Sequence, residues 1–405
     1  MSAETLSRAR EILQRLVGFA TVTDRSNHAL IDYVQRYYKD LGVTTWRAPN
    51  AAGDKSALMA TIGPAVEGGV VLSGHSDVVP VEGQKWSGDP FALREVDGRL
   101  YGRGACDMKG FDAVALAMVP EFLAAGLKRP IHILLSYDEE TTCLGSLDLI
   151  ARFGRETPRP ALAIVGEPTM MTCADTHKGV ATFHTRVTGL EAHSARPMLG
   201  ANAVAIAADV VSEIGRLARA YEAPELCNPR FDPPYSTLCV GEIHGGTARN
   251  ILARQCDFHW EFRGLPGVPT AEAAAKVQAF VDDVALPRLT RFVSGPTIET
   301  IMEVDVPSLA AQADNAAASL ALRLTRSNTL TTVSFATESG HFPRPPACRP
   351  SSAAPARSTR RTSPTNSSRF RSSRPASTSC ARWRSNYRAE AAFASAIVAT
   401  KRRNR

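Results

Sequence analysis

The spacing of apolar residues in the first 165 positions changes repeatedly between the helix period and the strand period. Two helical stripes are expected near the start: Leu6, Ala9, Leu13 and Leu16, then Ile31, Val34, Tyr38 and Leu41. Short apolar runs at 70–72, 131–136 and 161–165 predict buried strands. This alternation predicts an α/β domain with a central, mostly parallel sheet and an active site at the carboxyl ends of its strands.

A different pattern begins near residue 177. Alternating positions predict two strands and helical spacing predicts a helix between them: Ala181, Phe183, Thr185 and Val187; Ala203, Ile206, Val210, Ile214 and Leu217; Cys256, Phe258, Trp260 and Phe262. We expect a smaller α+β domain at 177–290, inserted into a catalytic domain formed by 1–176 and 291–342. Residues 331–336 are expected to return to the first sheet as a strand.

Composition is ordinary for a globular protein, but charge is unevenly distributed. The 405 residues are 44% hydrophobic and carry a net charge of +7. Residues 343–405 hold fourteen Arg, one Lys and a single acid, whereas the remaining chain has 32 bases and 39 acids. The acidic body argues against a nucleic-acid-binding protein, although the basic tail keeps that alternative open.

Cysteine usage and hydropathy bear on the compartment. The eight cysteines are scattered without a CxxC pair, which argues against a zinc ribbon or a disulfide framework and favours a reduced cytoplasm. No apolar run approaches the roughly 18 residues of a membrane helix, so no membrane association is expected.

Candidate chemistry lies where the predicted strands end. His75 and Asp77 follow the first apolar run, Asp138, Glu139 and Glu140 follow the second, and Glu167 follows the third. Asp107 lies in a glycine-containing turn. A solvated acidic turn or a hydrogen-bonded strand-end histidine explains each feature alone. Together they form a mixed nitrogen and oxygen donor set that suits zinc, cobalt or manganese.

Four motifs carry a family resemblance. GHSDVVP, GRGACDMKG, DEET and GEPT resemble, in order and spacing, the motifs of the amidohydrolase family that contains acetylornithine deacetylase, succinyl-diaminopimelate desuccinylase and related carboxypeptidases. The resemblance covers about residues 6–342. It implies a metallopeptidase-like catalytic domain with two divalent ions, zinc or cobalt. It also implies roles for six residues: His75 and Glu167 hold one ion, Asp107 bridges, Glu140 holds the second, Asp77 orients His75, and Glu139 is the general base.

The same resemblance implies that the inserted domain is a lid and dimerisation domain. His193, in the run EAHS, matches a histidine that reaches the site of a partner subunit, which implies a homodimer. Asn250 and Arg263 match polar lid residues that face substrate, and Gly340 lies in the last substrate-contacting segment, 331–342.

The implied activity is removal of the acetyl group from N2-acetylornithine, giving ornithine and acetate in arginine biosynthesis. The alternatives within the family are succinyl-diaminopimelate desuccinylase or another hydrolase of acylamino acids or dipeptides. An alternative of another class is a catalytically inactive metal-binding dimer.

The tail departs from the family, which has an apolar strand, a glycine loop, a metal-binding histidine and a helix after residue 342. Here the chain is rich in Arg, Ser and Pro, which is typical of disorder. Back-translation of residues 353–377 with the frame shifted by two bases permits a glycine loop followed by His-Lys-Pro-Asp-Glu. We therefore interpret 343–405 as a frameshift product, with the missing histidine encoded across the codons of Arg361 and Thr362.

Overall fold

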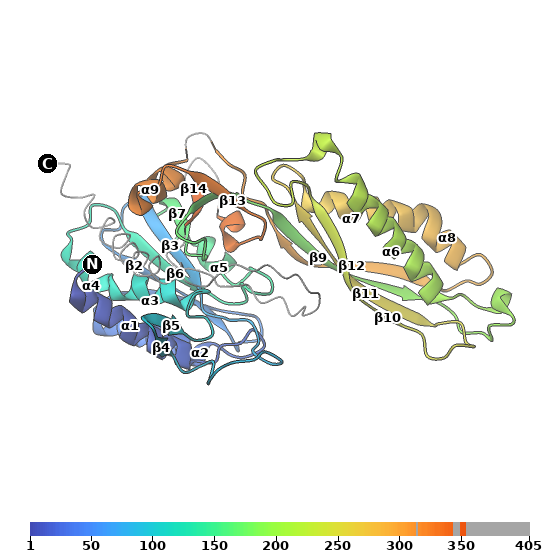
Figure 1. The fold of residues 1–405 in the computed structure, drawn as a ribbon, viewed down its shortest axis with the longest axis horizontal. Helices are drawn as coiled ribbons and strands as arrows, with labels where there is room; N and C mark the ends of the chain where they lie inside the picture. The colour runs from blue at the N-terminus through green and yellow to red at the C-terminus, as the bar shows by residue number, and fades with distance from the viewer. Residues whose placement is uncertain (313–314, 343–348, 354–405) are drawn as a thin grey trace. The chain divides into compact units, whose positions relative to one another are not determined.

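The computed structural model describes residues 1–312, 315–342 and 349–353 (Figure 1). The chain forms two compact units, and each is described by itself. Unit 1 comprises Met1–Asp175, Ala311–Thr331 and Thr337–Arg405, and unit 2 comprises Thr176–Ala310 and Thr332–Ala336.

An eight-stranded mixed sheet forms the centre of unit 1, with the strand order β1-β2-β6-β3-β7-β14-β8-β13. Strands β6, β3, β7 and β14 are parallel neighbours, whereas β1, β2 and β8 pair antiparallel. The bounds are β1 Thr45–Pro49, β2 Ser56–Ile62, β3 Gly69–His75, β6 Ile131–Ser136, β7 Pro160–Val165, β8 Cys173–His177, β13 Leu330–Val333 and β14 Arg349–Ala353. A separate hairpin pairs β4 Arg94–Val96 with β5 Arg99–Tyr101.

Helices pack on the apolar faces of this sheet. The larger core joins the sheet to α1, α2, α3, α4 and α9, and it buries Leu16, Ile31 and Leu116 completely or nearly so. A smaller core joins the other face to α5 and Phe342. The bounds are α1 Ala3–Gly18, α2 His28–Asp40, α3 Lys109–Ala117, α4 Val119–Ala124, α5 Leu147–Ile150 and α9 Ala316–Thr325. The predicted α/β fold class is thereby confirmed, because helices cover a sheet whose central strands are parallel.

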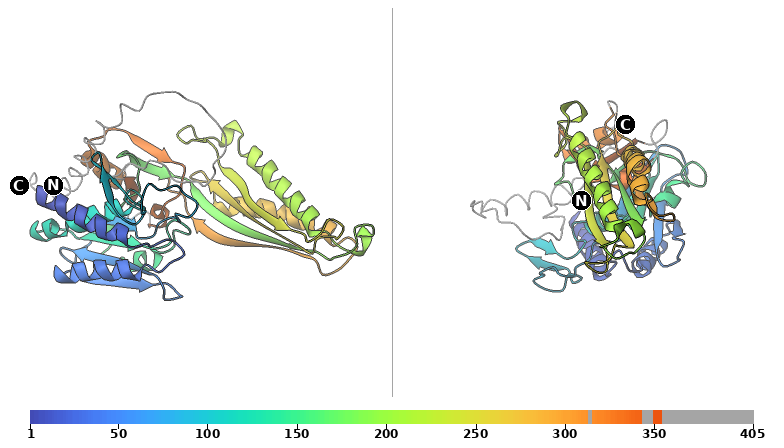
Figure 2. Two further views of the ribbon diagram at one scale, coloured as in Figure 1. Left: turned by 60° about the horizontal axis from the view of Figure 1, so that its bottom comes forward. Right: turned by 90° about the vertical axis from the view of Figure 1, so that its right-hand side faces the viewer.

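Unit 2 is a four-stranded antiparallel sheet, ordered β10-β11-β9-β12, with its helices on one face (Figure 2). Alternate residues of β9 and β11, such as Phe183 and Trp260, face the helices and are buried, as the period-two pattern predicts. The strands are β9 Gly179–Thr188, β10 Thr237–Gly245, β11 Gln255–Gly264 and β12 Thr297–Val306. The helices are α6 Ala203–Ala220, α7 Thr270–Phe280 and α8 Leu286–Leu289, with a π-helical turn η3 Val281–Ala285 and short 3-10 turns η1 Pro197–Leu199 and η2 Pro224–Leu226.

Three features of the fold differ from the sequence prediction. Unit 2 continues past residue 290 to Ala310, because β12 pairs with β9 along its whole length. The expected return strand at 331–336 is shorter and ends at Val333. In the tail, Arg349–Ala353 forms β14 beside β7, so backbone pairing occurs where disorder was expected. The rest of the predicted disordered tail lies outside the described residues.

Two further observations concern membrane-spanning segments and cysteines. Among the described residues, no helix is long and apolar enough to cross a membrane. Cys143 and Cys256 are buried free thiols, and Cys239 is an exposed one.

Candidate metal centre

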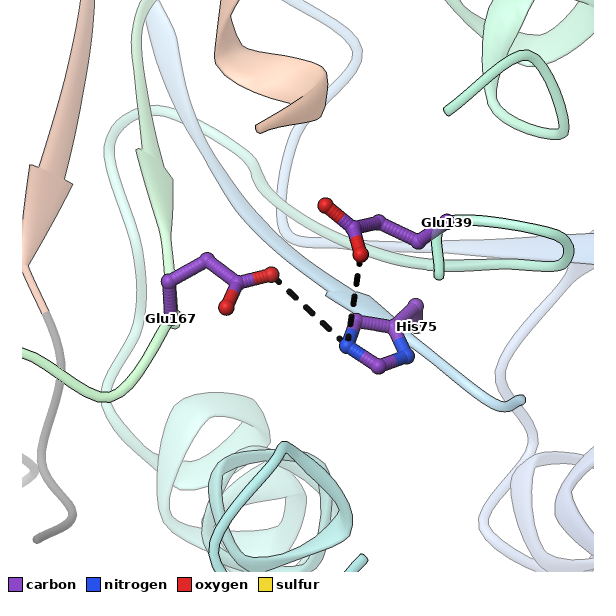
Figure 3. A group of neighbouring side chains, drawn as sticks. All are labelled: His75, Glu139 and Glu167. Carbon is purple, nitrogen blue, oxygen red and sulfur yellow. Dashed lines mark ion pairs between the residues drawn. The ribbon is translucent and has the colours of Figure 1, made fainter. Parts of the chain in front are cut away.

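The carboxyl ends of three adjacent parallel strands carry most of the candidate ligands. Strand β3 ends in His75, β6 is followed by Glu139 and Glu140, and β7 is followed by Glu167. Because β3 lies between β6 and β7 in a parallel arrangement, these ends meet at one edge of the sheet. Figure 3 shows the carboxylates of Glu139 and Glu167 approaching the same ring nitrogen of His75.

One ring nitrogen of His75 faces three carboxylates. Its Nε2 lies 3.2 Å from Oδ1 of Asp107, 3.6 Å from Oε1 of Glu167 and 3.9 Å from Oε2 of Glu139. Two sets of three ligand atoms converge within 4.8 Å: His75 with Glu139 and Glu167, and His75 with Asp107 and Glu140. The candidate ligands Asp107, Glu140 and Glu167 therefore lie around the buried imidazole of His75. Glu139, for which the family resemblance implies the role of base, lies in the same cluster.

The other ring nitrogen of His75 is held by Asp77, but through the main chain. Nδ1 lies 2.9 Å from the carbonyl oxygen of Asp77 and 3.5 Å from its carboxylate Oδ1. Since a carbonyl only accepts, Nδ1 carries the hydrogen, and in the neutral ring Nε2 is then available as a ligand.

The Asp77 carboxylate also holds the acidic turn after β6. It accepts the backbone amides of Glu139 and Glu140, at 3.2 Å and 3.1 Å. One residue therefore fixes both the imidazole and the two following glutamates. This refines the sequence expectation, which assigned the carboxylate to His75 alone.

Asp107 lies in the turn before α3. Lys109, two residues later, anchors this turn through two hydrogen bonds. The amide of Lys109 donates to the carbonyl of Gly104 at 2.8 Å, and its buried Nζ donates to the carbonyl of Phe19 at 2.8 Å. Gly104 has a φ of +76°, which favours glycine. Burial lowers the pKa of Lys109 to about 7.

The buried carboxylates around His75 favour binding of a cation. Burial opposes protonation of His75, but hydrogen bonds with Asp107 and Asp77 outweigh it and raise its pKa well above the usual value. Burial, and then the charge of Asp107, raise the pKa of Glu140 to about 8. Carboxylates crowded in a buried site demand protons or a metal ion, so this donor set fits divalent metal.

Two buried acids near the ligands were missed by the sequence analysis. Glu338, in the 3-10 turn η4 Glu338–His341, is 1% exposed, and Asp112 on α3 is 2% exposed. Burial raises the pKa of Glu338 to about 7 and that of Asp112 well above its usual value. Gly74 leaves room for Asp112, because a Cβ there would lie 2.1 Å from Asp112 Oδ1. In the sequence, Gly74 of the GHSD motif indicates that another side chain approaches this strand closely, and that was the available signal for Asp112.

Cys143 is a further residue that the sequence analysis did not assign. Its thiol lies 3.4 Å from Oε1 of Glu139 and 3.2 Å from the carbonyl oxygen of Glu139. Burial, and then the charge of Glu139, raise the pKa of this thiol well above its usual value, so it carries a proton to donate.

The remaining predicted residues are divided between the units. Gly340 lies in unit 1, in η4. His193 and Asn250 lie in unit 2, are exposed and are adjacent, since the amide of Ser194 donates to the carbonyl of Asn250 at 3.0 Å. Arg263, at the end of β11, pairs with Glu261 in the same strand at 2.9 Å and 3.0 Å.

Solved structures share this fold at low sequence identity. A tripeptidase from Staphylococcus aureus matches with a TM-score of 0.69 at 16% identity, covering 97% of this chain and 96% of that one. Human carnosine dipeptidase 1 matches with a TM-score of 0.64 at 15% identity, covering 97% and 98%. The YXEP protein of Bacillus subtilis, described as a dinuclear metal binding peptidase, matches with a TM-score of 0.58 at 15% identity, covering 98% and 100%.

The family model for peptidase family M20/M25/M40 matches residues 71–342, which include His75, Asp107, Glu139, Glu140 and Glu167. The match spans about two thirds of the sequence. The chain therefore belongs to peptidase family M20/M25/M40.

Proposed function

We propose that this protein is a metal-dependent amidohydrolase that removes the acetyl group from N2-acetylornithine. The observation that carries the proposal is the buried His75, whose Nε2 faces carboxylates from three separate segments of unit 1. That arrangement supports metal-assisted hydrolysis of an amide.

One divalent ion, zinc or cobalt, fits the donors around His75 in the chain as it stands, and a second ion needs the histidine expected from the alternative reading frame. His75, Asp107 and Glu167 would hold one ion, and Asp107 and Glu140 would contribute to the other. When bound, such ions supply Lewis acidity toward the amide carbonyl and make water more acidic. The description of the Bacillus subtilis protein as dinuclear supports a total of two ions.

Glu139 is the general base of the proposed reaction. Its carboxylate removes a proton from water as the water oxygen bonds to the amide carbon, and it returns that proton to the leaving nitrogen as the C–N bond breaks. Its backbone amide is held by Asp77, and its carboxylate lies against the Cys143 thiol. The products are acetate and the free amine of ornithine.

Glu139→Gln tests this role, with Glu140→Gln as the matched variant. Both are measured in frame-restored protein, in which the tail after Phe342 is returned to the alternative reading frame. Glu139→Gln should lower kcat by ~10²–10⁴ and leave the metal content nearly unchanged, because it removes a base and no ligand. Glu140→Gln should lose metal. If Glu139→Gln loses the metal instead, the two roles are reversed.

The preference for N2-acetylornithine over N-succinyl-diaminopimelate is expected to depend on the acyl group and on the cationic side chain of ornithine. A succinyl group carries a second carboxylate, which needs an additional cation in the cleft. Frame-restored protein should therefore show a kcat/KM for N2-acetylornithine at least ~10-fold above that for N-succinyl-diaminopimelate, a difference of about 1.4 kcal/mol. The reverse ranking would support the desuccinylase alternative. Faster cleavage of a dipeptide would favour the peptidase alternative, which the names of the tripeptidase and dipeptidase structures support.

We also propose a homodimer formed through unit 2. Exposed apolar side chains near His193 support it: Leu190, Met198 and Leu199 are 43%, 52% and 55% exposed. Burial of such residues against a second copy would remove apolar surface from water. Light scattering should give twice the chain mass, and Leu199→Glu should lower it to one chain.

A further inference from the structure

The helix-free face of the unit 2 sheet gathers three histidines on adjacent strands. Helices α6, α7 and α8 lie on the other face, where Phe183 and Trp260 are buried (Figures 1 and 2). His184 on β9 alternates with Phe183, and His259 on β11 alternates with Trp260, so both imidazoles belong to the helix-free face. This histidine face is defined by His184, His259 and His244 on β10.

Strand register places these side chains opposite one another. His184 pairs directly with His259, and their rings stack with centroids 4.6 Å apart and planes 8° apart. His244 pairs directly with Asp257, one step along the same face from His259. Directly paired residues of an antiparallel sheet have neighbouring side chains. Three of the nine histidines in the chain therefore lie within reach of one carboxylate.

Carboxylates already contact both stacked imidazoles. Oδ1 of Asp257 lies 2.8 Å from Nε2 of His184, and Oε2 of Glu303 lies 3.5 Å from Nδ1 of His259. Two ligands of one ion, each about 2.1 Å from it, lie roughly 3 Å apart. The hydrogen bond between the His184 nitrogen and the Asp257 oxygen therefore holds these atoms at about the separation of neighbouring ligands, and a bound ion would replace the hydrogen between them.

We propose that the histidine face binds a divalent late-transition metal ion through His184, His259 and Asp257, with His244 as a further ligand. Imidazole and carboxylate together suit zinc, nickel or copper. The ion would tie β9 to β11, and through His244 to β10. The site lies entirely in unit 2 and shares no residue with the centre around His75, so it is independent of the proposed function.

Binding requires two local changes. Within the described residues, three ligand atoms converge within 4.8 Å only around His75, so the His259 ring has to turn toward His184. The His259 side chain is 45% exposed, which leaves it space to turn. Arg186 Nε also donates to Oδ1 of Asp257, at 2.7 Å, so the ion has to compete with a guanidinium.

Nickel binding to the full 405-residue chain tests the proposal, with Ni²⁺ alone as the probe. Equilibrium dialysis and calorimetry should show that His184→Gln and His259→Gln each lose one equivalent of Ni²⁺ relative to the unchanged chain. His28→Gln, which removes an imidazole from unit 1, should lose none. The Ni²⁺-dependent rise in unfolding temperature should shrink in the same two variants.

Arg186→Gln supplies a test in the opposite direction. It frees Asp257 from the guanidinium and removes a positive charge, so the apparent Kd for Ni²⁺ at the histidine face should fall several-fold. His244→Gln should weaken binding without abolishing it. Equal Ni²⁺ stoichiometry in the unchanged chain, His184→Gln and His259→Gln would overturn the proposal. An unchanged or higher Kd in Arg186→Gln would remove Asp257 from the ligand set.

Discussion

The Oγ of Ser73 donates a 2.5 Å hydrogen bond to Oε1 of Glu338. Ser73 lies two residues before His75 on β3, whereas Glu338 lies in the turn η4, 265 residues further along the chain. This bond connects the strand that carries the central imidazole to the segment that contains Gly340. The carboxyl of Glu338 thus lies within electrostatic reach of Glu139 and His75.

Burial of Glu338 predicts a pH-dependent stability of the metal-free protein. Its pKa is raised to about 7, against about 4.3 for an unfolded glutamate. Between these values the folded state binds the extra proton, so the contribution of Glu338 to stability is greatest below pH 4.3 and falls as pH rises to 7. Glu338→Gln, which keeps an acceptor for Ser73, should therefore be more stable than the unchanged chain at pH 8, by up to a few kcal/mol.

Urea unfolding of both proteins at pH 5 and pH 8, after metal removal, measures this difference. The advantage of Glu338→Gln should grow with pH. An advantage that is the same at both pH values would mean that Glu338 does not hold a proton in the folded state.

Gly74 and Asp112 should behave as a coupled pair. Gly74→Ala places a Cβ 2.1 Å from Asp112 Oδ1, and both residues are buried. Overpacking of this kind costs roughly 1–3 kcal/mol, and the displaced strand end should weaken metal binding by His75. Removing the clashing carboxyl in the double variant Gly74→Ala/Asp112→Ala should recover much of the loss. Additive losses in the double variant, measured by urea unfolding, would contradict a direct contact.

Cys143 and Cys239 should differ sharply in thiol reactivity. Cys143 is buried and its pKa is raised, whereas Cys239 on β10 is exposed. Since the thiolate is the reactive form, iodoacetamide at pH 8 should label Cys239 in the folded protein and leave Cys143 unlabelled. Peptide mass spectrometry reads both sites, and urea should make them equally reactive. Rapid labelling of Cys143 in the folded chain would show that the turn after β6 opens to solvent.

The fold and the clustering of the candidate ligands were predictable because each signal was local. The apolar runs at 131–136 and 161–165 predicted β6 and β7, and the polar residues just after them lie at one sheet edge because parallel strands share an orientation. Glu338 and Asp112 were not predictable in this way, because their burial depends on contacts with β3 that no sequence period records. The end of unit 2 was also missed, since β12 exposes most of its side chains and lacks a clear apolar alternation.

Restoring the reading frame after Phe342 should restore the second ion and the activity together. In the chain as it stands, residues 343–405 contain no histidine, so the second ion retains Asp107 and Glu140 from the proposed set. Two carboxylates without an imidazole hold a zinc-type ion poorly. The 405-residue protein should therefore bind close to one ion per chain at the His75 centre at micromolar zinc, and it should have negligible deacetylase activity. The ions are counted in His184→Gln protein, so that metal bound at the histidine face is not included. Frame-restored protein with the same substitution should gain a second ion and activity together. Two ions at this centre and full activity in the unrepaired chain would contradict the prediction and make His341 the first residue to test as a replacement ligand.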